Sequence, residues 1–192
     1  MQGLKKPLFT QTLTNSFKRF MTVGQKVPNL NLTLIEYRNG QYMKTYASTT
    51  SLFSAGKSVL FGFTGAYNPA CENFILPEFI KKAKELKKEG VKFYAMSVND
   101  PYVLQAFAKK LGAREYLDFI ADGSAELTKA LNVEADLSEY GFGLRCRRFA
   151  ITFQDGKIVE RSDIEEDRKV ITPFNVSPGV DIQRSLNAIL QL

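Results

Sequence analysis

Histidine is absent from this chain of 192 residues, and cysteine occurs only twice, as Cys71 and Cys146. The lack of imidazole excludes histidine bases, Ser-His-Asp and Cys-His nucleophile pairs, and histidine metal ligands. Two cysteines are too few for a structural zinc site, which needs about four nitrogen or sulfur ligands. They are also too few for a disulfide framework, which favours a reducing compartment. We therefore expect neither a metal ion nor a cofactor.

Long apolar runs are missing as well. No stretch approaches the roughly 20 apolar residues that a membrane-spanning helix requires. Apolar residues nevertheless make up 44% of the chain, which is sufficient for one hydrophobic core. The sequence therefore predicts a single globular domain with an extension and no membrane span.

The excess of positive charge is concentrated at the start of the chain. Lys and Arg number 26 against 20 Asp and Glu, for a net charge of +6. The first acidic residue is Glu36, so residues 1–35 carry +5 and residues 36–192 carry only +1. The nearly neutral remainder has no basic stripe interleaved with stacking aromatic residues, the pattern typical of nucleic-acid surfaces. We expect no nucleic-acid partner.

Residues 1–24 have the pattern of a leader. Phe9, Leu13, Phe17 and Phe20 recur at helical spacing, with basic and polar residues on the other side. A basic, acid-free, amphipathic start is typical of an organelle transit peptide, although a surface helix or a disordered tail has the same composition. We predict a mitochondrial leader over residues 1–24, with plastid or cytoplasmic location as alternatives, and a main domain over residues 25–192.

After the leader the pattern changes to that of an α/β domain. Alternating leucines over residues 30–34 predict a half-buried strand, and Asn39-Gly40 predicts a tight hairpin turn. The apolar run over residues 58–63 predicts a central strand that is buried on both faces. Strand and helix patterns then alternate, which predicts an α/β fold with a central mixed sheet, helices on both faces and an N-terminal β-hairpin.

The second half of the chain continues this pattern, with further predicted strands and helices. Ser124 is predicted to cap a helix, and residues 144–153 are predicted to form one long strand. Asp155-Gly156 predicts a second hairpin turn, and Asp181 is predicted to begin a closing helix that ends at Leu190.

The turn before Cys71 carries the candidate chemistry. Asn68 is a favourable N-cap, Pro69 suits the first helical position, and Cys71 then lies in the first turn. Backbone N–H groups and the helix dipole favour a thiolate at this position, which lowers the thiol pKa and makes the sulfur nucleophilic. The alternative is a buried cysteine with a packing role.

These residues resemble the peroxidatic-cysteine segment of the peroxiredoxins, thiol peroxidases with a thioredoxin-like fold. The chain is most similar to the type-V subgroup, and the resemblance extends from about Val23 to Lys157. It is carried by Val59-Leu60-Phe61-Gly62, Gly65-Ala66-Tyr67, Pro69, Cys71, Leu76-Pro77-Glu78-Phe79, Ser97-Val98-Asn99-Asp100 and Arg147-Arg148-Phe149. The resemblance implies that Cys71 is the peroxidatic cysteine and that Arg148 stabilises its thiolate.

The family motif, P-x-x-x-T/S-x-x-C, is altered at two positions. Asn68 stands where the family has Thr or Ser, and Thr64 stands where it has Pro. The family hydroxyl both accepts from and donates to the peroxide and thiolate, whereas an amide differs in reach and geometry. Losing one preorganised contact to a transition state typically costs about 10²–10³ in rate. We expect an attenuated or lost peroxidase.

The second cysteine allows two interpretations. The type-V subgroup has its resolving cysteine in a loop near the C-terminal part of the chain, where no cysteine occurs here. On one continuous strand, Cys146 and Arg148 would face the same side, about 7 Å apart. Cys146 is therefore either a resolving cysteine or a packed residue without a role in the reaction.

Two functions follow. The altered motif favours a degenerate peroxiredoxin that serves as a structural or interaction subunit of a mitochondrial assembly, or as a homodimer. The alternative is an active thiol-dependent peroxidase that reduces hydrogen peroxide and organic hydroperoxides through Cys71, in a one-Cys mechanism with an external thiol reductant.

Overall fold

The computed structural model describes residues 21–163 of the chain. Residues 1–20 of the predicted leader and the predicted closing helix from Asp181 to Leu190 lie outside the described residues. No helix in the described part of the chain is long and apolar enough to cross a membrane.

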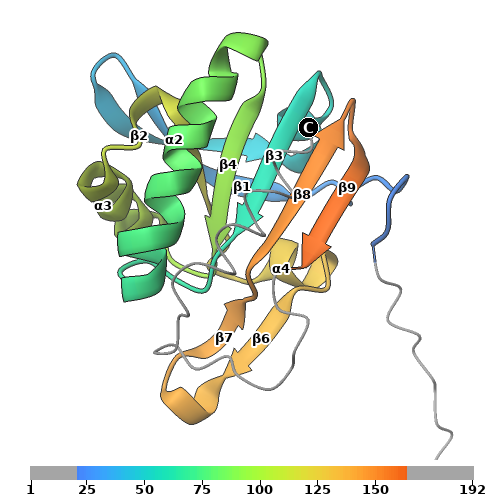
Figure 1. Cartoon of the computed structure of the whole chain (residues 1–192). Helices are drawn as coiled ribbons and strands as arrows, with labels where there is room; N and C mark the ends of the chain where they lie inside the picture. The colour runs from blue at the N-terminus through green and yellow to red at the C-terminus, as the bar shows by residue number, and fades with distance from the viewer. Residues whose placement is uncertain (1–20, 164–192) are drawn as a thin grey trace, which may run out of the picture.

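A seven-stranded mixed sheet forms the centre of the molecule (Figure 1). Its strands, in spatial order, are β2 (Gln41–Ser48), β1 (Asn31–Arg38), β5 (Asp118–Ala121), β4 (Lys92–Ser97), β3 (Lys57–Gly62), β8 (Phe149–Gln154) and β9 (Lys157–Asp163). The three central strands β5, β4 and β3 are parallel, and β1 and β8 flank them in antiparallel pairing. A separate antiparallel pair consists of β6 (Glu134–Leu137) and β7 (Gly143–Cys146). The mixed sheet and the N-terminal β-hairpin are therefore as predicted.

Helices cover both faces of the sheet, as predicted. The main helices are α1 (Thr49–Phe53), α2 (Leu76–Leu86), α3 (Pro101–Leu111) and α4 (Glu126–Ala130). One π turn, η1 (Cys71–Ile75), precedes α2, and three 3₁₀ turns are η2 (Lys87–Glu89), η3 (Arg114–Tyr116) and η4 (Ser138–Tyr140). Helices α2 and α3 pack on one face, and α1 and α4 pack on the other.

Two hydrophobic clusters result from the alternation of side chains along the strands. Phe61 packs on the α2 and α3 face, where its ring centroid lies 4.9 Å from that of Phe79. Its neighbour Leu60 packs on the α1 and α4 face, together with Phe149. Because every central strand is buried on both sides, the apolar run that forms β3 is nearly continuous, as predicted for such a strand.

Both predicted hairpin turns are confirmed. Asn39 and Gly40 have φ values of 52° and 84°, and Asp155 and Gly156 have values of 49° and 80°. Two consecutive residues with positive φ are the signature of the type I′ turn, which Asn-Gly and Asp-Gly pairs adopt most readily. The turns join β1 to β2 and β8 to β9.

The predicted long strand over residues 144–153 is wrong, because the chain changes sheets within it. Its first part is β7, which pairs with β6, and its second part is β8 in the main sheet. At the break, the backbone N–H of Arg147 donates to the carbonyl oxygen of Val133 at 2.8 Å. The Arg147 guanidinium donates to the carbonyl oxygen of Asn132 at 2.7 Å. These bonds hold Arg147 to the β6 segment, so Cys146 and Arg148 do not lie on one continuous strand.

The predicted cap of α4 is also wrong. Ser124 does not cap the helix; the buried carboxylate of Asp122 does. It accepts from the backbone N–H of Leu127 at 3.1 Å and from the backbone and hydroxyl of Thr128, both at 2.7 Å. Asp122 follows β5 directly, and Ala125, with φ of 56°, turns the chain so that the first N–H groups of the helix face this carboxylate.

Candidate functional site

The loop between β3 and α2 lies at the carboxyl ends of the parallel strands. There, the side-chain oxygen of Asn68 accepts from the backbone N–H of Ala70 at 3.0 Å. The backbone carbonyl oxygen of Asn68 accepts from the backbone N–H of Glu72 at 2.8 Å. Asn68 is therefore the N-cap of the helical segment, as predicted, and the helical conformation begins at Pro69.

Cys71 opens the π turn that leads into α2. The backbone N–H of Leu76 donates to the Cys71 carbonyl oxygen, a five-residue step that widens the turn. The cause lies at Pro77, which has no N–H and whose ring would collide with a carbonyl four residues back in a regular α-helix. Turns of this kind occur often at functional sites. The Cys71 side chain is only 1% exposed and packs in the cluster beneath α2 and α3.

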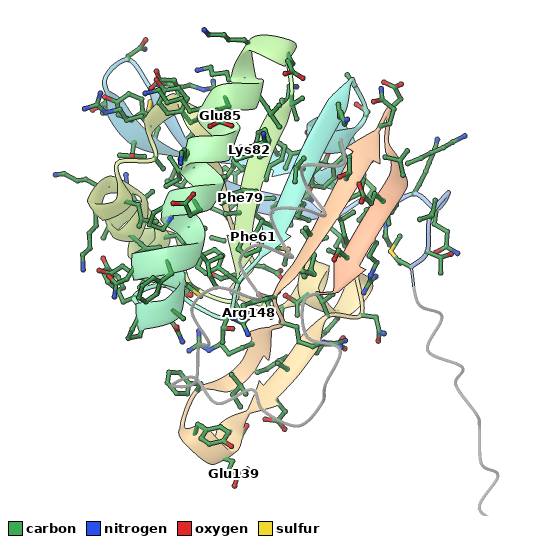
Figure 2. The ribbon with its side chains drawn as sticks, viewed as in Figure 1. Phe61, Phe79, Lys82, Glu85, Glu139 and Arg148 are labelled. Atoms are coloured by element: carbon green, nitrogen blue, oxygen red, sulfur yellow. The ribbon has the colours of Figure 1, made fainter. Side chains whose placement is uncertain are left out.

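Arg148 lies at the junction between β7 and β8, where Figure 2 labels it. The following residue, Phe149, pairs with Gly62 at the end of β3. A Cβ atom at Gly62 would lie 2.1 Å from the Phe149 ring, so only glycine permits this close approach. The pairing places Arg148 beside the end of the strand from which the Cys71 loop departs.

A cavity of about 180 Å³ lies over this loop. It is lined by Thr64, Gly65, Ala66, Tyr67, Asn68, Pro69, Asn99, Phe142 and Arg145. The structure thus brings together Thr64 and Asn68, the two positions at which the chain departs from the peroxiredoxin motif. Cys71 and Arg148 are not among the described residues that line the cavity.

Contacts from neighbouring elements fix the conformation of the loop. The side-chain oxygen of Asn99 accepts from the backbone N–H of Ala66 and from the hydroxyl of Ser97, each at 3.0 Å. Tyr67 has a φ of 61°, a left-handed conformation that costs energy for a residue other than glycine. Its ring centroid lies 5.0 Å from that of Phe107 on α3, and this packing holds the strained residue in place.

Lys110 of α3 makes a further connection to the site. Its ammonium lies 5.3 Å from the centroid of the Tyr67 ring and pairs with the carboxylate of Glu72 in the π turn. The loop and the π turn are therefore both fastened to α3.

Sequence reasoning missed Arg145. Its guanidinium donates to the carbonyl oxygen of Val98 at 2.7 Å and to that of Phe142 at 2.9 Å. Arg145 therefore ties the β6–β7 hairpin to the segment after β4 and holds Phe142 against the cavity. The signal in the sequence is the presence of three arginines among residues 145–148, of which the resemblance assigns a role only to Arg148.

Cys146 lies on the other side of the sheet from Cys71. It is buried in the cluster beneath α1 and α4, and its Sγ donates to the carbonyl oxygen of Arg147 at 3.0 Å. The central sheet separates the two thiols, so the structure does not bring Cys146 to the candidate site.

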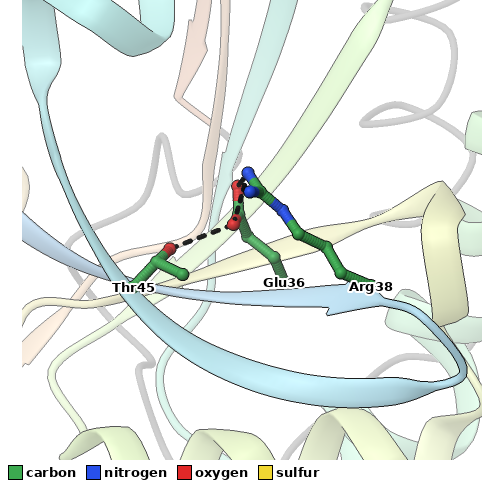
Figure 3. A network of polar contacts seen from close by, with 3 residues as sticks. All are labelled: Glu36, Arg38 and Thr45. Carbon is green, nitrogen blue, oxygen red and sulfur yellow. Dashed lines mark hydrogen bonds and ion pairs between the residues drawn. The ribbon is translucent and has the colours of Figure 1, made fainter.

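A second polar cluster lies on β1 and β2, next to the start of β5, and Figure 3 shows three of its residues, Glu36, Arg38 and Thr45. The Glu36 carboxylate pairs with the Arg38 guanidinium at 2.7 Å and accepts from the Thr45 hydroxyl at 3.0 Å. Burial, together with the nearby charge of Glu36, raises the pKa of Asp118 to about 7. Burial also raises the pKa of Tyr94 on the adjacent strand. In the described part of the chain, no group of three or more Cys, Asp or Glu residues could hold a metal ion.

Comparisons with known proteins identify the family of the chain. The chain matches the Redoxin family over residues 22–176. It is 38% identical over 167 residues to Peroxiredoxin-2B from Arabidopsis thaliana, which covers 86% of this chain and 98% of the relative. It is 37% identical over 149 residues to the chloroplastic Peroxiredoxin-2E from the same plant, which covers 76% of this chain and 62% of the relative.

A solved structure has a similar fold. Reduced Prx3 from Vibrio vulnificus, in complex with hydrogen peroxide, superposes with a TM-score of 0.69 at 32% identity. The superposition covers 87% of this chain and 99% of that one. The predicted thioredoxin-like (peroxiredoxin) fold is confirmed, and the chain belongs to the peroxiredoxins of the Redoxin family.

Proposed function

We propose that this protein is a type-V-like peroxiredoxin whose peroxidase site is degenerate, and that it acts mainly through protein contacts as a structural or interaction subunit of a mitochondrial assembly. One observation carries the proposal. The cavity at the site is lined by Thr64 and Asn68 and not by Cys71, whose side chain is 1% exposed. A peroxide in this cavity would meet an altered wall rather than the sulfur.

The chemistry of Asn68 supports the same conclusion. In a thiol peroxidase the thiolate attacks one peroxide oxygen, the O–O bond breaks, and the sulfur becomes a sulfenic acid while the other oxygen leaves as an alcohol or water. A hydroxyl at position 68 could donate to one group and accept from another. The Asn68 oxygen accepts from the backbone N–H of Ala70, so it already serves the helix cap, and neither polar atom of an amide can both donate and accept as a hydroxyl does.

Exposed apolar side chains frame the site and support a role in protein contacts. They lie in the loop, the π turn and the β6–β7 hairpin, and are Tyr67, Phe74, Tyr140, Phe142 and Leu144. Apolar groups gathered in this way are typical of protein interfaces. A partner chain or a second copy of this chain seated here would cover the cavity.

A specific observation also favours a second candidate, an active one-Cys peroxidase. The named relatives are peroxiredoxins, and the Vibrio vulnificus structure holds hydrogen peroxide. Cys71 lies in the first turn after the Asn68 cap, where a thiolate is favoured. With Cys146 on the other face, an external thiol would attack the sulfenic sulfur, release water and form a mixed disulfide, and a second thiol would then restore Cys71.

The mitochondrial location rests on the basic leader over residues 1–24. Plastid location is the first alternative, since one relative is named chloroplastic. Cytoplasmic location is the second. Imaging of the full-length chain with a C-terminal fluorescent tag distinguishes the three.

Stopped-flow oxidation of the reduced protein with hydrogen peroxide and an organic hydroperoxide tests the proposal. The expected rate is no better than that of a simple thiol, and equal in Cys71→Ser and Cys146→Ser. Asn68→Thr combined with Thr64→Pro should restore a fast, Cys71-dependent reaction. A fast rate in the unaltered chain that disappears only in Cys71→Ser would establish the one-Cys peroxidase instead.

A further inference from the structure

A groove of about 640 Å³ lies between the β1–β2 hairpin and α3, at the sheet edge opposite the Cys71 loop. Its main side chains are Tyr37, Tyr42, Tyr102, Gln105, Lys109 and Arg114. The volume is within the range of about 300–1,000 Å³ that is usual for small-molecule sites. Figure 1 shows β2 and α3 next to each other on this side of the molecule.

Hydrogen bonds hold the walls of the groove in place. The Tyr42 hydroxyl donates to the carbonyl oxygen of Ala108 at 2.9 Å and accepts from the backbone N–H of Arg114 at 2.7 Å. The Gln105 side chain donates to the Tyr42 carbonyl oxygen at 2.8 Å. Arg114 has a left-handed φ of 45°, and its bond to Tyr42 fixes that strained conformation. The groove is therefore preformed.

The side chains that line the groove carry positive charge, which the neighbouring carboxylate of Glu115 offsets in part. Lys109 and Arg114 line it, and no acidic side chain does. Within residues 21–163, no carboxylate lies at ion-pair distance from either of them. The carbonyl oxygens at the end of α3 would repel an anion, but the N–H of Gly112 already donates to two of them. The groove suits an anionic group.

The tyrosine side chains of the groove indicate what else a ligand with an anionic group would contain. The rings of Tyr37 and Tyr42 meet edge to face with centroids 5.0 Å apart. Tyr102 is well exposed, and the Lys44 ammonium lies 5.1 Å from its centroid. Tyrosine rings in a concave site offer faces and edges on which a planar heterocycle packs.

We propose that this groove binds a nucleoside phosphate, with its base against the tyrosine rings and its phosphate between Lys109 and Arg114. Two cations match the charge of a phosphate monoester better than that of a single carboxylate. Arginine also binds phosphate oxygens in a two-point geometry. The site is separate from the Cys71 chemistry.

Calorimetric titration of the full chain with AMP tests the proposal, with adenosine and inorganic phosphate as separate probes. AMP should bind more tightly than either fragment. Lys109→Ala and Arg114→Ala should each weaken AMP binding about tenfold or more, as loss of a charged hydrogen bond does. Lys88→Ala, an exposed lysine on η2 away from the groove, is the matched control and should bind AMP normally.

Several results would overturn this assignment. One is an AMP affinity that neither Lys109→Ala nor Lys109→Glu reduces. Another is inorganic phosphate binding as tightly as AMP, which would indicate a simple anion site. A third is binding of an acidic peptide in place of AMP. Thermal unfolding confirms that each variant is folded, and Cys71→Ser should bind AMP like the unaltered chain whatever its peroxidase activity.

Discussion

The guanidinium of Arg145 donates to the carbonyl oxygen of Val98 at 2.7 Å, although 47 positions separate them in the chain. This bond joins the small β6–β7 sheet to the end of β4 in the main sheet. It also determines where the hairpin lies relative to the Cys71 loop, because the same guanidinium holds the carbonyl of Phe142. The wall of the candidate site thus depends on one side chain.

Arg145→Ala should lower the free energy of unfolding by about 1.5–3 kcal/mol, the usual contribution of hydrogen bonds to a charged donor. It should also increase the exposure of Phe142, because the carbonyl that anchors this residue loses its partner. Urea denaturation measures the first effect, and hydrogen exchange of the β6–β7 hairpin measures the second. Lys129→Ala, on the exposed part of α4, is the control. Unchanged exchange in the hairpin would contradict this role for Arg145.

Gly62→Ala should destabilise the protein by about 1–3 kcal/mol, the typical cost of overpacking a core. The new methyl group would lie 2.1 Å from the Phe149 ring. Gly65→Ala is the matched control, since its Cβ would have no neighbour closer than 3.5 Å. Phe149→Leu should recover part of the loss in a double-mutant cycle. Equal stability of the two alanine variants would show that Phe149 moves at no cost.

Asp118→Asn should remove a pH dependence of stability. The folded pKa of Asp118 is raised to about 7, chiefly by burial, above the unfolded value of about 3.9. The carboxyl therefore contributes stability that is fully present below about pH 4 and is lost as the pH rises through about 7. The unaltered protein should lose up to ~1.4 kcal/mol per pH unit across this window, and the Asn variant should not.

Urea denaturation at pH 4, 6 and 8 measures this difference. Asp155→Asn is the control. A hydrogen bond from Gln154 lowers the pKa of Asp155, so this carboxylate stabilises the fold at higher pH. Its replacement should therefore change the pH dependence of stability in the direction opposite to that of Asp118→Asn. Parallel curves for Asp118→Asn and the unaltered chain would mean that Asp118 titrates in the same way in both states.

Asp122→Ala should cost about 2–4 kcal/mol, since the loss of a helix cap adds to the loss of buried hydrogen bonds. The variant would leave the N–H groups of Leu127 and Thr128 without their acceptor. Ser124→Ala, at the position that the sequence favoured, should change stability by less than about 0.5 kcal/mol. Chemical denaturation of both variants compares the two caps directly, and a larger loss in Ser124→Ala would reverse the assignment.

Local signals in the sequence predicted the features that depend on few neighbours. The Asn39-Gly40 turn follows from the φ preferences of its two residues, and the Asn68 cap follows from its own side chain. The break at Arg147 could not be predicted in this way. It depends on bonds to Val133 and Asn132, which a strand pattern over residues 144–153 does not reveal.

The same division applies to the candidate site. The position of Cys71 at the start of a helix follows from the order of residues 68–71. Its cavity does not, because Phe142 and Arg145 come from a hairpin about 70 residues later, and only tertiary packing brings them to the loop. The cap of α4 by Asp122 was missed for a related reason, because a buried carboxylate after a strand is recognisable as a cap only once the turn at Ala125 is known.

Met21 sets a limit on how much of the N-terminal segment can be removed without disturbing the core. Its side chain is 8% exposed within the α1 and α4 cluster, and its carbonyl oxygen accepts from the Arg161 guanidinium at 3.0 Å. Three residues later, the N–H of Gly24 donates to the carbonyl oxygen of Ile158 at 2.7 Å. Removal of the chain up to and including Met21 would take a core side chain and the acceptor of the Arg161 bond with it. Any shortened form that keeps this core intact would therefore begin at Met21 or before it.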